Sequence, residues 1–127
     1  LEQARSDGNR SEEVILLLGQ SYEELNDSNY ALKLYEDYVV QSPSGSIYNQ
    51  MGLCYFGTGD YESAVSAFEK GLSVQESTCK QQLAYNQIVA YENMGKFEIA
   101  KSLMAGYLKT YPDDAEAARE YEFLQSR

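Results

Sequence analysis

The sequence predicts an all-α protein, an α-solenoid in which helical hairpins stack side by side. Apolar residues recur at helical spacing along nearly the whole chain. The two prolines, Pro43 and Pro112, both fall where a predicted helix ends. One pattern also occurs three times, with Tyr at its first place, Ala at its tenth and a bulky apolar residue at its fourteenth. Its copies are Tyr22–Tyr35, Tyr55–Phe68 and Tyr91–Met104.

The first predicted hairpin begins at Ser11, which we expect to cap the first helix. Glu12 and Glu13 would then occupy the opening turn, where acidic side chains favour the positive end of the helix dipole. The turn-forming stretch "NDSN", residues 26–29, separates this helix from the second one, which ends at "SPSGS", residues 42–46.

The second predicted hairpin turns at "GTGD", residues 57–60, where Gly supplies a positive φ and Asp60 caps the next helix. The third hairpin turns at residues 93–95, and its second helix stops at Pro112. A seventh helix follows, with Asp113 and Glu116 as an acidic capping box.

The spacing of the repeated pattern explains why the hairpins should stack. A single helix pair cannot bury its apolar face alone, so stacked pairs share a continuous core. The small Ala at the tenth place lets two helices approach closely, and the aromatic residue or Met at the fourteenth fills the space beside it. We therefore expect one extended core that runs through all the hairpins.

The composition excludes several classes of function. The formal net charge is −10, from 20 acidic and 10 basic residues. Such a surface repels phosphate backbones and anionic lipids, so we expect no nucleic-acid partner. It serves either solubility or the attraction of basic or neutral peptides. No apolar run approaches the ~20 residues that cross a bilayer, so no membrane insertion by this segment is expected.

The chain also lacks the residues on which most enzymes depend. There is no His, so the usual general base and the commonest transition-metal ligand are missing. The two cysteines, Cys54 and Cys79, stand far apart and are interpreted as free thiols, with a disulfide left open as the alternative. The carboxylate pairs Glu23 with Glu24 and Asp113 with Asp114 are interpreted as solvated faces and helix caps. We expect no catalysis, no metal and no cofactor.

The repeated pattern resembles the tetratricopeptide repeat, a helix-turn-helix unit of ~34 residues. Three departures occur: Tyr38 replaces a small residue, Glu76 stands where Pro is usual, and Gln87-Ile88 replaces Leu-Gly. The positions that match the family in the three units are Ile15, Leu18-Gly19, Tyr22, Ala31, Tyr35 and Pro43; Tyr48, Met51-Gly52, Tyr55, Ala64, Phe68 and Gly71; and Ala84, Tyr91, Ala100, Met104, Tyr107 and Pro112.

The resemblance implies a domain plan for the whole chain. Residues 11–112 form three units, at approximately 12–44, 45–80 and 81–112, and residues 113–127 form a C-terminal capping helix. Residues 1–10 are interpreted as the residual end of a preceding helix or a linker, because the chain begins without Met and looks like a piece of a longer protein.

The resemblance further implies a non-enzymatic protein-interaction module, which binds a peptide or helix of a partner protein in the concave groove of the first helices. The partner would be basic or apolar. An alternative is a structural spacer or self-association segment that stacks through its N-terminal edge, Leu1 to Ser6. The groove positions carried over from the family are Leu16, Gln20, Glu23, Asn49, Leu53, Phe56, Tyr85, Asn86, Val89 and Glu92. For Leu53, Phe56 and Val89, packing against neighbouring helices remains a second interpretation.

One subclass of the family is argued against. Its chaperone-binding members clamp a C-terminal carboxylate with Lys, Asn and Arg. The corresponding places in this sequence hold no cation; they are Leu16, Gln20, Gln50, Gln82 and Asn86. The ending of the chain is similar to bacterial repeat proteins, some of them exported lipoproteins. A cytoplasmic location is favoured, and an exported bacterial lipoprotein domain is the alternative.

Overall fold

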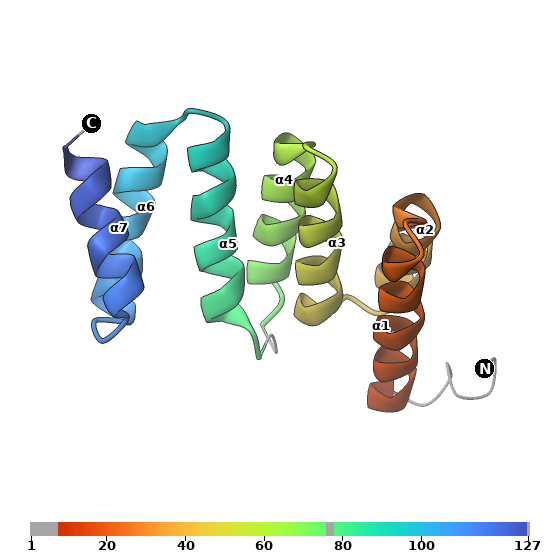
Figure 1. Cartoon of the computed structure of the whole chain (residues 1–127). Helices are drawn as coiled ribbons and strands as arrows, with labels where there is room; N and C mark the ends of the chain where they lie inside the picture. The colour runs from red at the N-terminus through yellow and green to blue at the C-terminus, as the bar shows by residue number, and fades with distance from the viewer. Residues whose placement is uncertain (1–7, 76–77, 127) are drawn as a thin grey trace.

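The computed structural model is an all-helical array in which residues 8–75 and 78–126 are described. Figure 1 shows the helical hairpins stacked in a row, from α1 at the N-terminal end to α7 at the C-terminal end. The predicted fold class is therefore confirmed. The helices of the described residues are α1 (Gly8–Glu24), α2 (Ser28–Gln41), α3 (Gly45–Gly57), α4 (Tyr61–Leu72), α5 (Lys80–Asn93), α6 (Phe97–Thr110) and α7 (Ala115–Gln125).

The array has two layers of helices. Figure 1 shows α1 in front of α2, α3 in front of α4, and α7 in front of α6. The first helices of successive hairpins contact one another, α1 with α3 and α3 with α5. Among the described helices, by contrast, no two of α2, α4 and α6 bring Cα atoms within 8 Å of each other. The first helices thus form the more closely spaced layer, as on the inner side of a curved solenoid.

Three buried clusters form the core along the array, and Tyr55 and Tyr91 each pack against two of them. One buried cluster joins Ile15 of α1, Tyr35 of α2, Ile47 of α3 and Ala67 of α4, so it crosses from the first hairpin into the second. The tenth and fourteenth places of the repeated pattern all belong to these clusters, as predicted. Their side chains are all 0% exposed: Ala31 with Tyr35, Ala64 with Phe68, and Ala100 with Met104.

Two glycines bring the paired helices of the first two hairpins together. A Cβ atom added to Gly52 would lie 2.2 Å from Cε1 of Phe68, and one added to Gly19 would lie 2.1 Å from the hydroxyl oxygen of Tyr35. Both aromatic rings are fully buried, so neither can move aside easily. In the third hairpin Ile88 occupies the corresponding place and packs in one cluster with Met104.

Side-chain caps set the turns between helices. Asp27, Ser44 and Asp60 accept hydrogen bonds from the backbone N–H groups that open α2, α3 and α4. The predicted cap at Asp60 is therefore confirmed, and Gly59 has the positive φ, 85°, that this turn requires. The turns at 26–29 and 42–46 are shorter than predicted, because the caps lie early enough for α2 to begin at Ser28 and α3 at Gly45.

Two predicted helix starts are wrong. Among the described residues α1 already includes Gly8, so Ser11 lies inside the helix and does not cap it; no strong helix breaker interrupts the polar residues between them. The N-cap of α7 is Asp114, not Asp113: its carboxylate accepts a hydrogen bond from Ala117 N–H at 3.1 Å and a second one from the Tyr107 hydroxyl at 2.6 Å. The predicted helix end at Leu1 to Ser6 lies outside the described residues.

Candidate interaction groove

The ten predicted groove residues all lie on the first helices α1, α3 and α5. None of them is fully buried. Gln20 and Leu53 are exposed and the other eight are half-buried. The fold therefore leaves each of these side chains with some solvent-exposed surface. Some of them face outward, and others are held by contacts with neighbouring helices.

An amide pair joins the middle of the row. The Nδ2 group of Asn86 on α5 donates a hydrogen bond of 2.9 Å to Oδ1 of Asn49 on α3. Stacking of the second and third hairpins brings these side chains together from positions 37 residues apart in the chain. A side-chain amide has two donor hydrogens and two acceptor lone pairs, so this pair retains the capacity to bond an extended backbone.

Glu23, at the α1 end of the row, is held inside the first hairpin. The Tyr35 hydroxyl donates a hydrogen bond of 2.7 Å to its Oε2 atom. Burial, and then the neighbouring Glu23 carboxylate, raise the pKa of the Cys54 thiol to about 12. This thiol is therefore protonated at neutral pH and is no nucleophile. Cys54 and Cys79 are both free, as interpreted from the sequence.

The apolar members of the row divide into packed and exposed side chains. Phe56 packs against the buried cluster that includes Phe68 and meets the ring of Tyr61 edge-on at 5.1 Å. Leu16 packs against the first cluster in the same way. For Phe56 the structure therefore favours the packing interpretation. Leu53 is 40% exposed and belongs to none of the core clusters, so its side chain is available to a partner.

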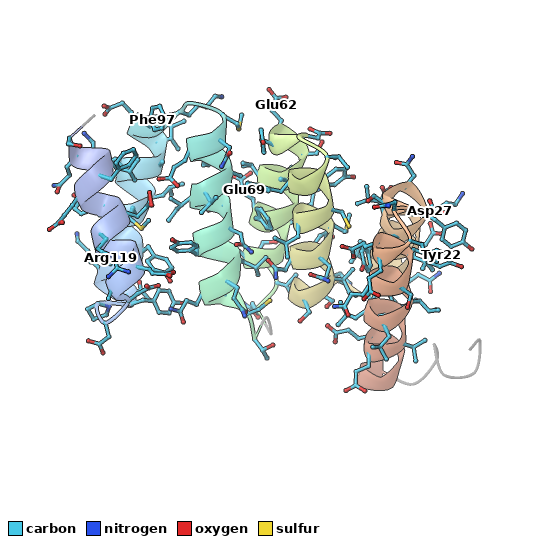
Figure 2. All side chains as sticks on the ribbon, in the orientation of Figure 1. Tyr22, Asp27, Glu62, Glu69, Phe97 and Arg119 are labelled. Carbon is cyan, nitrogen blue, oxygen red and sulfur yellow. The ribbon has the colours of Figure 1, made fainter. Side chains whose placement is uncertain are left out.

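A hollow of about 500 Å³ lies between α5 and α7, which are neighbours in the front layer (Figure 1). It was not predicted from the sequence. No Cα atom of α5 lies within 8 Å of one in α7, although α3 contacts α5 closely. Figure 2 labels one lining side chain, Arg119, on α7. The sequence did contain a signal for this hollow, because its four α7 residues recur at spacings that place them on one face of a helix. The lining of this hollow, called the α5–α7 pocket below, consists of Tyr85, Glu116, Arg119, Glu120 and Phe123.

The surroundings of the α5–α7 pocket are negatively charged. Burial raises the pKa of the Tyr85 hydroxyl, and four carboxylates raise it further: those of Glu120, Glu116, Asp114 and Glu92. A negative field disfavours the charged form of a phenol. Tyr85 is also held in place by Tyr107, whose ring lies edge-on to it with centroids 5.8 Å apart.

A second hollow, of about 360 Å³, lies among α4, α5 and α6. Its lining is more apolar and includes Leu72, Ala84, Ile88 and Leu103. Gly106 of α6 borders it, and a Cβ atom added there would meet nothing within 4 Å.

Residues 8–75 and 78–126 contain neither a metal-binding cluster nor a membrane-spanning helix. No group of three or more Cys, Asp or Glu side chains is placed to hold a metal ion. No helix in these ranges has the length and apolar character of a membrane span.

Comparison with known families places the repeats along most of the chain. Tetratricopeptide repeat family models match residues 45–78 in one case, and residues 13–44 and 82–114 in the other. A search of curated protein sequences found no match.

Solved structures with the same fold share little sequence with this chain. The first tetratricopeptide domain of Spaghetti (RPAP3), bound to the HSP90 peptide SRMEEVD, is 18% identical, with a TM-score of 0.75 over 89% of this chain and 91% of that one. The second such domain of human RPAP3, with the HSP70 peptide SGPTIEEVD, is 14% identical, with a TM-score of 0.75 over 89% and 93%. A crystal structure of MamA is 20% identical, with a TM-score of 0.78 over 98% of this chain and 72% of that one.

Proposed function

This chain belongs to the tetratricopeptide repeat family, and we propose that it binds an extended segment of a partner protein along its row of first helices. The family is generally a non-enzymatic, protein-interaction fold. The observation that carries the finer proposal is the Asn49–Asn86 amide pair, which bridges two first helices at the middle of the row.

The amide pair and its neighbours suit an extended peptide. Each amide can both donate to and accept from a peptide backbone, which gives affinity without reading the ligand sequence. Leu53 lies one helical turn along α3 from Asn49 and offers an exposed apolar contact for a side chain of the ligand. Polar anchoring beside an apolar contact is typical of a peptide-binding surface.

The ligand we propose differs from those of the RPAP3 domains. Those two structures hold peptides that end in the acidic sequence EEVD. In this chain the places of the carboxylate clamp hold Leu16, Gln20, Gln50, Gln82 and Asn86, and the net charge is −10. An acidic tail would meet hydrogen-bond donors but no cation, and it would be repelled by the overall charge. We therefore propose a basic or apolar segment as the ligand.

One observation favours the alternative function, self-association or stacking on further repeats. Four large apolar side chains are exposed on the first hairpin, at the N-terminal end of the array. They are Leu17 (65%), Leu25 (73%), Tyr30 (50%) and Val40 (83%). Exposed apolar side chains on the terminal hairpin of a solenoid are expected where another unit covers that hairpin.

A peptide selection tests the proposed function. Random extended peptides displayed on phage are selected on residues 1–127, and the affinity of the recovered peptides is then measured by fluorescence anisotropy. Asn49→Ala combined with Leu53→Ala should weaken binding by about tenfold or more. Ile99→Ala on α6 is the matched control, because Ile99 is 43% exposed and lies on a second helix.

The outcome separates the two functions. Equal affinities for the groove variant and the control, at unchanged helical circular dichroism, would reject binding on the first helices. If no peptide is recovered and sedimentation velocity shows assembly that Leu25→Glu abolishes, the self-association function replaces the one proposed.

A further inference from the structure

We propose that the α5–α7 pocket receives an arginine side chain of the partner segment. This inference rests on the proposed function, and it specifies the chemistry that the C-terminal end of the row of first helices selects. The pocket extends past the groove positions carried over from the family: it shares Tyr85 with them, and its other four lining residues belong to α7.

The geometry of the pocket is set by the packing around it. α7 lies apart from α5, and a hollow of about 500 Å³ remains between their facing side chains. One wall is rigid: Tyr85 meets Tyr107 edge-on, and the Tyr107 hydroxyl donates to Asp114 at 2.6 Å and accepts from Gln81 Nε2 at 3.1 Å. A wall held in this way loses little side-chain entropy when a ligand binds.

The charge of the pocket selects a cation. Glu116 and Glu120 line it, and the carboxylates of Asp114 and Glu92 lie close enough to act on the Tyr85 hydroxyl at its edge. Arg119 is the one cationic side chain among the lining residues. Four carboxylates against one guanidinium give a negative potential at this hollow, and this potential attracts a positive group.

The two aromatic rings favour arginine over lysine. A guanidinium is planar, so it can lie against the face of Tyr85 or Phe123 while its N–H groups pair with a carboxylate. Charge-assisted, bidentate pairing of this kind is the strongest hydrogen bonding that an arginine makes. A lysine ammonium would have the charge interaction but would lack the stacking and the fork geometry.

A substitution of Arg119 distinguishes a cationic from an anionic ligand, because it should change their affinities in opposite directions. As a cation at the pocket, it repels an incoming guanidinium and attracts an incoming carboxylate. Arg119→Gln should therefore strengthen the binding of an arginine probe. If the pocket serves acidic ligands instead, the same substitution should weaken their binding.

The experiment is a titration followed by amide nuclear magnetic resonance shifts of residues 1–127. The probes are N-acetyl-arginine-N-methylamide, its lysine counterpart and its glutamate counterpart. The arginine probe should shift amides of α5 and α7 around Tyr85 and residues 116–123, and it should bind more tightly than the lysine probe. Glu116→Gln with Glu120→Gln should weaken it by about tenfold, and Arg119→Gln should strengthen it by about threefold. Glu13→Gln with Glu62→Gln is the control, because it changes the net charge equally on α1 and α4.

The failure of this inference can be told from failure of the proposed function. Shifts spread over the whole surface, equal loss in the control variant, or a glutamate probe bound between α5 and α7 would each overturn the pocket assignment. Peptide binding that depends on Asn49 and Leu53 would be untouched by those results. Conversely, arginine binding at the pocket without any selected peptide would leave the pocket assigned and reject the proposed function.

Discussion

The first two hairpins and the third solve the same packing problem with different residues. In the first two, a glycine on the first helix faces a buried aromatic ring on the second: Gly19 faces Tyr35 and Gly52 faces Phe68. In the third hairpin Ile88 takes the place of the glycine and Met104 that of the aromatic residue. Both of these side chains are also buried, at 1% and 0% exposure.

The difference indicates that the summed volume of the two facing side chains constrains the packing of a hairpin more than the identity of either residue. A glycine paired with a large ring fills about the same space between two helices as two medium-sized side chains do. Cores accept coordinated changes of this kind if the total volume is kept. The departure of Gln87-Ile88 from the family pattern therefore leaves Ile88 buried in one cluster with Met104, which changes with it. Gln87 is also accommodated: its Nε2 group donates to Glu69 of α4 at 3.3 Å.

The largest effect is expected from converting the third hairpin toward the first two. Ile88→Gly removes a fully buried side chain and adds helix flexibility, so it should reduce the free energy of unfolding by about 3–5 kcal/mol. Met104→Phe alone should overpack the site. The stability lost in the double variant should be smaller than the sum of the two single losses by more than about 1 kcal/mol, because the ring fills the space left by Ile88. Urea unfolding of all four proteins measures this coupling, and additive losses would refute the shared-volume explanation.

The next effect concerns the glycine of the second hairpin. In Gly52→Leu the new Cβ would lie 2.2 Å from Phe68, a ring that is 0% exposed. We expect a loss of about 1–3 kcal/mol by overpacking, seen as a lower melting temperature. Gly57→Ala is a matched control on the same helix, since a Cβ atom there meets nothing within 4 Å. A parent-like melting temperature for Gly52→Leu would contradict the packing at this contact.

Much of the fold was predictable because its signals are local. Helical periodicity and the Tyr, Ala and bulky residues of the repeated pattern indicated the hairpins, and Asp60 indicated a cap. The ends of helices were harder. Asp113 and Asp114 look alike in the sequence, and the choice between them depends on Tyr107, whose hydroxyl approaches Asp114 only after α6 and α7 have packed.

The candidate site was less predictable than the fold. The family positions predicted which residues of α3 and α5 line the groove, Asn49 and Asn86 among them. They did not predict the hydrogen bond between these two amides, which depends on how two hairpins stack. Glu23 was chosen for its place on α1, yet Tyr35 of α2 holds its carboxylate. The α5–α7 pocket arises from the distance between two helices, and no short stretch of sequence contains that distance.

The smallest effect concerns the polar contact that ends the array. The hydrogen bonds from the Tyr107 hydroxyl and then from Ala117 N–H hold the pKa of Asp114 below its ordinary value of 3.8. Because the folded protein lowers this pKa, the contribution of the Asp114 carboxylate to stability is present above about pH 4 and is lost as the pH falls through the lowered value. Asp114→Asn keeps an oxygen acceptor but removes the charge. Its urea midpoint should lie slightly below that of the parent at pH 7, and the two midpoints should converge toward pH 2.

Asp113→Asn is the control for this last experiment. It removes the same charge one residue earlier, where the side chain does not cap α7. Its midpoint should follow that of the parent across the pH range more closely than the midpoint of Asp114→Asn does. A difference between Asp114→Asn and the parent that persists at pH 2 would show that shape rather than charge matters at the cap. The C-terminal end would then depend on packing alone, as the glycine contacts of the first two hairpins do.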